Sequence, residues 1–201
     1  MVVHGGQKVT IEKPFAPEGT LETTATIRGY YDLRKFAIVL VDTETRASGS
    51  IVAKTTWNIV FRGEGGFGGA TPPREDTPKV PKDRAADFRF EEKTSAEQAL
   101  LYRLSGDVNP LHADPEFAKS VGFEQGPILH GLCTYGVAVR HVTKGCGDRV
   151  ISFAASFKRP VWPGDTLVTE GWLLDEKLVA IQTSVKEREE VVLGGAWAKL
   201  R

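Results

Sequence analysis

The chain has 201 residues, and its 26 Lys and Arg residues balance its 26 Asp and Glu residues, so its formal charge is zero. Nucleic-acid affinity depends on clustered cations, so this balance argues against a general polyanion binder, and we expect no nucleic-acid partner. A hydrophobic fraction of 41% is typical of a globular protein. No apolar run reaches the roughly 18 residues that a membrane-spanning helix needs, so we expect no membrane partner.

The termini and the cysteines indicate a compartment. Residues 1–6 contain no basic stretch before an apolar block, and residues 198–201 are not a Ser-Lys-Leu peroxisomal signal. Cys133 and Cys146 would lie about 20 Å apart on one helix at about 1.5 Å per residue, which is too far for a disulfide. We therefore expect a soluble intracellular protein of a reducing compartment, cytoplasmic or peroxisomal, without a clear targeting signal.

The first third of the chain predicts β structure. Residues 7–62 contain short apolar runs rich in β-branched residues, separated by turn-forming segments. A glycine-rich stretch over 63–69 then leads into a segment rich in proline and charge. We interpret residues 1–70 as an N-terminal unit and residues 71–94 as a linker.

Three helices are expected next. Thr94 or Ser95 would cap a short first helix, and Asp114, followed by proline, would begin a second. A third helix would run from about Ile128 to Lys144 and end at Gly145. Residues 149–200 are again β-like, so residues 95–201 form a second unit.

An internal repeat relates the two units. Residues 13–21 align with residues 159–167: in both copies a basic residue and a proline are followed by a second proline and then by Thr-Leu. The two prolines, Pro14 and Pro160, are 146 positions apart. This favours duplication of a β-rich unit over chance similarity of two turns. Only the second copy is preceded by a helical segment.

The stretch 102–115 carries the chemistry. It holds Asp107, Asn109 and His112 around a glycine and two prolines, which stiffen the turn. A carboxylate and an imidazole five residues apart across such a turn can converge on one water molecule and share its protons. The alternatives are that Asp107 and Asn109 cap turns and that His112 is structural. A metal site of His112, Asp114 and His130 is disfavoured because no ligand spacing supports it, and we expect no metal.

Taken whole, this stretch closely resembles the signature of the hydratase 2 family, the (R)-specific enoyl-CoA hydratases of the MaoC-like group. The shared pattern, Tyr-Arg-Leu-Ser-Gly-Asp-x-Asn-Pro-Leu-His-x-Asp-Pro, is met from Tyr102 to Pro115. Further segments that look like family segments lie at residues 4–7, 65–69, 126–134 and 157–164. The resemblance therefore covers nearly the whole chain, and it includes the hydratase unit of peroxisomal multifunctional enzyme type 2.

The resemblance implies an α+β double hot-dog fold, in which two antiparallel sheets each wrap a helix. It implies reversible addition of water to trans-2-enoyl-CoA without a cofactor, the acyl-CoA thioester being the substrate. By the match, Asp107 and His112 are catalytic, and Asn109 orients water or substrate. Gly131 would present its N–H to the thioester oxygen, where the positive end of a helix dipole favours negative charge.

The remaining candidate residues would bind CoA. Lys158 and Arg159 are adjacent cations before a proline-fixed turn, which suits phosphate groups, although a solvated charged turn is an equal alternative. The resembling segments add two pairs to the substrate-binding set. These are His4 with Gly5 and Gly66 with Phe67.

The chain departs from the family in one major respect. Family members carry a segment before His4 that includes the central helix of the first hot-dog, so the first hot-dog here is expected to lack its helix. An apolar sheet face would be left open, which predicts a homodimer or other oligomer, or a fragment of a longer product. The glycine loop at 122–127 also reads one residue longer than in many relatives.

Three other functions compete with the hydratase. The missing helix suits a catalytically inactive acyl-CoA-binding or partner subunit. A dehydratase that acts on acyl-carrier protein would use the same residues. Hot-dog thioesterases rank low because they usually lack this turn.

Overall fold

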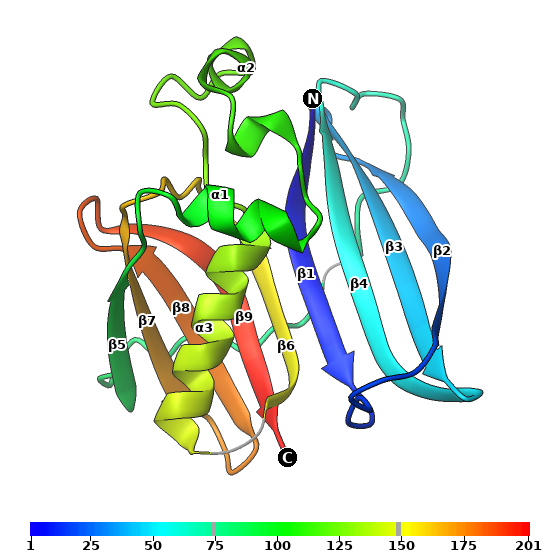
Figure 1. Ribbon diagram of the computed structural model, residues 1–201, viewed down its shortest axis with the longest axis vertical. Helices are drawn as coiled ribbons and strands as arrows, with labels where there is room; N and C mark the ends of the chain where they lie inside the picture. Colours follow the sequence, from blue (N-terminus) through cyan, green and yellow to red (C-terminus); the bar gives the residue numbers. More distant parts are fainter. Residues whose placement is uncertain (74, 148–149) are drawn as a thin grey trace.

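The computed structural model describes residues 1–73, 75–147 and 150–201. Nine strands form one antiparallel sheet in the order β2-β3-β4-β1-β6-β9-β8-β7-β5 (Figure 1). The strands are β1 (Val2–Ile11), β2 (Leu21–Asp32), β3 (Phe36–Ala47), β4 (Ser50–Arg62), β5 (Phe88–Lys93), β6 (Val150–Phe157), β7 (Thr166–Leu173), β8 (Leu178–Val185) and β9 (Glu190–Leu200). The helices are α1 (Gln98–Tyr102), η1 (Arg103–Ser105), η2 (Pro110–His112), α2 (Pro115–Ser120) and α3 (Gly131–Cys146), where η marks 3₁₀ turns.

The internal repeat appears as a pseudo-two-fold axis at the middle of the sheet. The strand order β2-β3-β4-β1 is mirrored by β7-β8-β9-β6, and β1 pairs with β6 across the centre. The register places Lys8 opposite Ala154, which are also the two residues that the 146-residue offset of the repeat equates. Strand β2 begins at Leu21 and strand β7 begins at Thr166, so the Thr-Leu pair of each copy lies at the start of a strand. The geometry therefore supports duplication over chance.

Helix α3 covers the second half of the sheet (Figure 1). Its inward residues Tyr135, Ala138 and Val142 pack into one cluster with Phe153 and Ile181 of the strands, all of them buried. Burial of each large apolar side chain stabilises the fold by about 1.5–3 kcal/mol. The second half is thus a complete hot-dog unit, a sheet wrapped on a helix.

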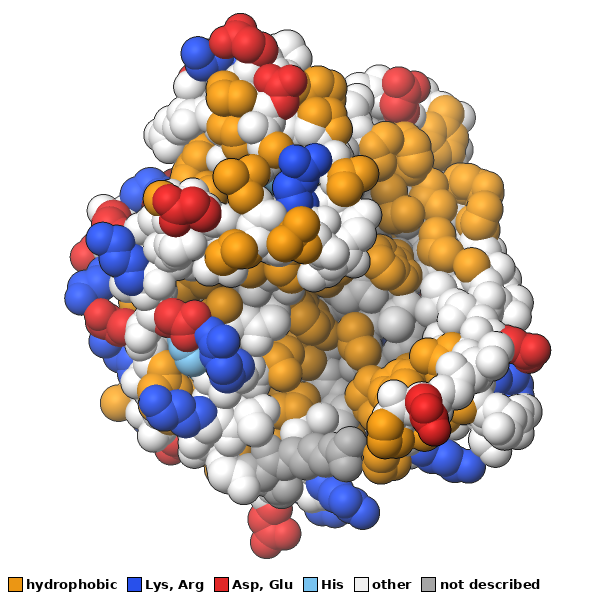
Figure 2. Space-filling view, viewed as in Figure 1, with side chains coloured by type: hydrophobic (Ala, Val, Ile, Leu, Met, Phe, Trp, Pro, Cys, Tyr) orange, Lys and Arg blue, Asp and Glu red, His pale blue; other side chains and the backbone are white. Residues whose placement is uncertain are grey.

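The first half of the sheet lacks such a cover among the described residues. One cross-strand row on the α3 side of the sheet pairs Ile27 with Val41 and Val41 with Trp57. Ile27 is 51% exposed and Tyr30, in the next row, is 61% exposed. Figure 2 shows hydrophobic side chains gathered over this half, beside the hollow next to α3. The open face expected from the sequence is confirmed.

The connection between the halves runs along the opposite face of the sheet. It begins at the β2 edge, where Asp32 N donates to Ala70 O, and it ends at β7, where Asp87 N donates to Gly171 O. Between them, Thr77 lies beside Gly195 of β9. On this face, Ile38 of β3 is buried.

The linker expected over 71–94 contains a strand. Its last residues form β5, which pairs with β7 at the edge of the sheet. Phe88 and Phe90 alternate with charged residues in β5, and Phe88 reaches the α3 cluster. Residue 74 of this linker, and residue 149 at the start of the second β-like region, lie outside the described residues.

Two expected helix ends are wrong. Helix α1 begins after Glu97 without a side-chain cap, because Thr94 Oγ1 instead donates to Asp165 O. Helix α3 ends at Gly147, whose φ of 62° is left-handed, and not at Gly145. Gly145 lies inside the helix, and its lack of a side chain leaves room for the ring of Phe88: an added Cβ would lie 2.5 Å from Phe88 Cγ.

Other local expectations are confirmed. Asp114 Oδ1 accepts hydrogen bonds from Glu116 N and Phe117 N and caps α2. Cys133 and Cys146 both lie on α3, which excludes a disulfide between them. Within the described ranges, the helices are all too short or too polar to cross a membrane.

Candidate active site

The catalytic candidates lie on a loop whose backbone is fixed by its own side chains. Gly106 ends η1 with a φ of 114°, a conformation that disfavours any residue with a Cβ. Asp107 Oδ1 then accepts from Asn109 N at 3.2 Å, and Asn109 Oδ1 accepts from Leu111 N at 3.1 Å. The turn-capping alternative for Asp107 and Asn109 is therefore real, but each still has a second side-chain heteroatom for other contacts.

The structure brings Asp107 and His112 together. A carboxylate oxygen of Asp107 and ring nitrogens of His112 and His130 all lie within 4.8 Å of one another. Asp107 is exposed, whereas His112 is 9% exposed. The convergence that the five-residue spacing predicted is confirmed, with one charged group facing solvent and one imidazole at the edge of the interior.

The tautomer of His112 follows from its partner. Its Nδ1 lies 2.8 Å from the carbonyl oxygen of Ile128, which can only accept, so Nδ1 carries the proton and donates. In this tautomer of the neutral ring the lone pair lies on the other nitrogen, Nε2, which can serve as a base. The segment before α3 thus orients the imidazole.

Gly131 is the first residue of α3, so its N–H has no partner within the helix. It is also packed closely, because an added Cβ would lie 3.1 Å from Phe157 Cε1. The positive end of a 16-residue helix dipole therefore lies at this amide, one residue after His130. An anionic oxygen placed here would be stabilised.

His4 reaches the same region from the other half of the sheet. Its ring stacks on Trp57 at 4.9 Å and meets the edge of Phe157 at 4.9 Å between centroids. Burial lowers the pKa of His4, and the nearby Asp107 carboxylate opposes this shift. Its Nε2 is buried and lacks a hydrogen-bond partner among the described residues. His4 therefore places a buried nitrogen without a hydrogen-bond partner among the described residues in the region of Asp107.

A cavity of about 380 Å³ opens beside His112. Its walls include Leu100 of α1, Pro127 and Trp162, so apolar side chains surround the imidazole on this side. The Trp162 ring is backed by the Arg188 guanidinium at 4.9 Å, and Arg188 forms an ion pair with Asp165. A substrate group that reached His112 through this cavity would contact the ring of Trp162, which Arg188 holds from behind.

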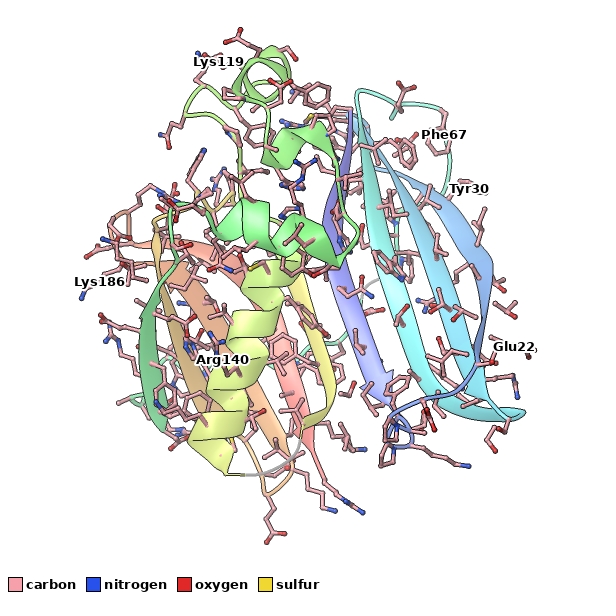
Figure 3. All side chains as sticks on the ribbon, in the orientation of Figure 1. Glu22, Tyr30, Phe67, Lys119, Arg140 and Lys186 are labelled. Carbon is pink, nitrogen blue, oxygen red and sulfur yellow. The ribbon has the colours of Figure 1, made fainter. Side chains whose placement is uncertain are left out.

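The residues expected to bind CoA lie on several separate elements of the structure. Lys158 and Arg159 are exposed and directly follow Phe157 in sequence, and the Lys158 side chain lies against Gly194 of β9. Gly66 and Phe67 lie at the β2 edge, where Figure 3 labels Phe67 above Tyr30. Three backbone N–H groups of this region, from Arg34, Gly66 and Gly68, bind the Asp32 carboxylate. Gly5 lies against Asn58 and Val60 of β4.

The cluster of Asp107, His112 and His130 does not fit a metal ion. The rings of His112 and His130 are stacked with centroids 3.7 Å apart, so their in-plane lone pairs run side by side. A metal bound at about 2.0–2.2 Å needs donors that converge on one point. His130 Nε2 is also engaged with Asp107 O at 3.1 Å. Asp114, named with the two histidines in the sequence alternative, caps α2 instead.

Three residues of the site were not singled out from the sequence for these contacts. Trp57 and Phe157 form the walls around His4, and His130 stacks on His112. Trp57 carries no local signal, because its approach depends on the pairing of β4 with β1. The sequence feature that could have identified His130 is its position directly before Gly131, the first residue of α3.

The fold and the site agree with comparisons to known proteins. Residues 78–195 match the model of the MaoC-like domain, and residues 1–63 match that of the MFE-2 hydratase 2 N-terminal domain. The peroxisomal enoyl-CoA hydratase 2 of Arabidopsis thaliana is 39% identical over 210 residues, with 97% of this chain and 67% of that protein covered.

Two further relatives extend the comparison. Peroxisomal multifunctional enzyme type 2 of Mus musculus is 36% identical over 203 residues, with 98% of this chain and 27% of that protein covered. The crystal structure of a MaoC-like dehydratase from Phytophthora capsici has a TM-score of 0.92 and 40% identity, with 100% of this chain and 72% of that chain covered.

A hot-dog sheet with an acid and an imidazole at the start of its helix defines the class of hot-dog hydro-lyases. The chain belongs to the MaoC-like family, and its first strands are those of the hydratase 2 N-terminal domain. The double hot-dog fold expected from the sequence is confirmed, with the first unit open.

Proposed function

We propose that the chain catalyses the reversible addition of water to trans-2-enoyl-CoA and forms (R)-3-hydroxyacyl-CoA. The observation that carries this proposal is the convergence of Asp107 and His112 beside the first amide of α3. The relatives named enoyl-CoA hydratase 2 support the same reaction.

In the proposed step, Asp107 and His112 together hold the attacking water. The water oxygen bonds to the β carbon of the enoyl group, and the pair takes up one water proton and delivers a proton to the α carbon. The electron pair of the double bond passes through the α carbon, so negative charge builds transiently on the thioester oxygen. The Gly131 N–H stabilises that oxygen. Asn109 orients water or substrate with its side-chain amide group.

The CoA portion requires cations and the acyl portion requires apolar surface. Lys158 and Arg159 are the proposed phosphate ligands, since both are exposed cations that directly follow Phe157 in sequence. His4 and Gly5 would contact the substrate from β1, where the unpartnered His4 Nε2 is available. Gly66 and Phe67 complete the proposed binding set from the β2 edge. The reaction needs no cofactor, because the activating group is the thioester itself.

A dehydratase is the second candidate, favoured by the name of the Phytophthora capsici relative. It would run the same reaction in reverse, with loss of water from a 3-hydroxyacyl thioester carried on acyl-carrier protein. A higher rate on the acyl-carrier-protein thioester than on the CoA thioester would identify this function. The relatives named peroxisomal lead us to propose a reducing intracellular compartment of this kind.

We also propose that a second copy of the chain covers the open face of β1–β4. The half-exposed Ile27 and Tyr30 support this, because burial of such side chains favours association. A homodimer is the simplest closed arrangement.

The decisive experiment follows loss of the conjugated thioester of crotonyl-CoA, with chiral analysis of the product. Asp107→Asn and His112→Gln should each lower the rate by about 10²–10⁴, the usual contribution of a general acid or base. Asp114→Asn is the matched control, because asparagine caps a helix as well as aspartate does and the rate should stay unchanged. Unchanged rates in both catalytic variants would refute the proposal. Binding of enoyl-CoA without hydration by the unaltered chain would instead identify an inactive acyl-CoA-binding subunit, and release of free thiol would identify a thioesterase.

A further inference from the structure

His130 lies between Asp107, His112 and the start of α3. It is 2% exposed and directly precedes Gly131 at the start of α3. Its Nε2 lies 3.1 Å from the carbonyl oxygen of Asp107, and its ring stacks on His112 with centroids 3.7 Å apart. One side chain therefore joins the loop of the carboxylate, the imidazole and the helix amide.

The partner of the His130 ring fixes its tautomer. The Asp107 carbonyl can only accept a hydrogen bond, so Nε2 carries the proton and donates. Nδ1 is buried and makes no hydrogen bond to the described residues. Burial is the largest cause that lowers the pKa of His130, so the ring is neutral at neutral pH.

Packing holds the ring in place. Tyr102 lies against His130 with centroids 4.8 Å apart, while His112 stacks on it. A ring enclosed in this way has little rotamer freedom, so its Nε2–H is directed at one point. Misplacement of a reacting group by about 1 Å can cost about 10² in rate, so such a directed contact bears on catalysis.

We propose that His130 is a positioning residue: through its Nε2–H it holds the Asp107 loop at a fixed distance from His112 and from the Gly131 amide. The inference deepens the proposed hydration and rests on it. His130 itself exchanges no proton with the substrate. Its contribution is the geometry of the two groups that do.

The test separates the donor from the ring. His130→Phe keeps a flat ring and removes the donor, and it should lower kcat for crotonyl-CoA about 10- to 100-fold with KM changed less than about threefold. His130→Gln places an amide donor near the position of Nε2 and should keep kcat within about fivefold of the unaltered chain. Equal losses in the two variants, or no loss in either, would overturn the proposal.

The matched control is His141→Phe. His141 is an equally buried imidazole of α3, but it faces Glu92 and not the site, with Nε2 at 3.4 Å from the Glu92 carboxylate. This variant should keep kcat within about twofold. A loss equal to that of His130→Phe would mean that any damage to α3 lowers the rate, which contradicts a specific role for His130.

A second measurement does not depend on a variant that folds or on turnover. The chain has four histidines, so the ring nitrogens can be resolved by ¹H–¹⁵N correlation spectroscopy. His130 should show a neutral ring with the proton on Nε2, and an Nδ1–H tautomer would overturn the proposal. If crotonyl-CoA is not hydrated at all, the proposed function fails, while this spectrum still decides whether His130 donates to the Asp107 loop.

Discussion

The ring of Phe157 lies directly against Gly131: a methyl group added at Gly131 would sit 3.1 Å from Cε1 of Phe157. His4 meets the other side of this contact, with its ring 4.9 Å from that of Phe157. The end of β6 thus links the first residue of α3 to the first strand of the chain. The amide proposed to bind the thioester oxygen is supported by both halves of the sheet.

Gly131→Ala should therefore lower the rate about 10-fold while the protein stays folded. Alanine suits a helix, but the ring or the helix start must move by a few tenths of an ångström to accept the methyl group. The measurement is kcat for crotonyl-CoA beside a thermal unfolding curve. Gly136→Ala, on the same helix with no atom within 4 Å of the added group, is the control. It should stabilise the protein by about 0.5–1 kcal/mol and leave kcat unchanged. Equal kcat in both variants would contradict a close fit at Gly131.

Acid should destabilise the protein below about pH 6.5. Burial is the first cause that lowers the pKa of His4, His130 and His141, so all three rings are neutral in the folded state. The unfolded chain takes up protons near the ordinary histidine pKa and the folded chain only at lower pH, so the free energy of unfolding is retained above the ordinary histidine pKa and falls as pH decreases through it. Urea unfolding at three values of pH from 7.5 to 5.5 checks this. Carboxylates such as Asp32, whose pKa is lowered by the hydrogen bond from the Gly66 N–H, affect the free energy of unfolding at a lower pH than the histidines do. A free energy that stays constant or rises on acidification would contradict the expectation.

Asp32→Asn should loosen the glycine-rich loop. The carboxylate accepts from Gly66 N at 2.8 Å and from Gly68 N at 2.7 Å, and an amide can accept with only one of its two heteroatoms. If Gly66 and Phe67 bind the substrate, KM for crotonyl-CoA should rise about three- to tenfold with kcat nearly constant. Asp42→Asn, on β3 beside Arg28, is the control and should leave KM unchanged. An unchanged KM in Asp32→Asn, with a loop shown to be loosened by faster amide exchange, would remove Gly66 and Phe67 from the binding set.

Ile27→Lys should weaken self-association. Ile27 lies on the open face of β2 and is 51% exposed, so a charge there opposes burial by a second copy while the change in monomer stability stays within about 0.5 kcal/mol. Sedimentation velocity over a range of concentrations measures the effect. Thr26→Lys places the same charge on the opposite face of the same strand and should leave association intact. A monomeric unaltered chain, or equal dissociation of both variants, would contradict the proposed dimer.

The sequence predicted the elements whose signals are local. Asp114 before a proline caps α2, and the stiff turn brings Asp107 to His112, because each depends on a few adjacent residues. Strand β5 was hidden in a charged segment, although Phe88 and Phe90 alternate with charges as an edge strand requires. The full site was not predictable: the resemblance named His4, but Trp57, which stacks on it, approaches through the pairing of β1 with β4, which no local signal indicates.

The pairing of Lys8 with Ala154 has a consequence for synthesis and folding. Strand β1 can join β4 early, because β4 follows soon after it in the chain, but its other partner, β6, is synthesised nearly 150 residues later. Contacts of such high sequence separation slow folding, and until β6 arrives the outer rim of β1 presents unpaired N–H and C=O groups. Until then the first half keeps a strand edge that can pair with other chains, and shortening the delay between the two strands should raise the yield of native protein.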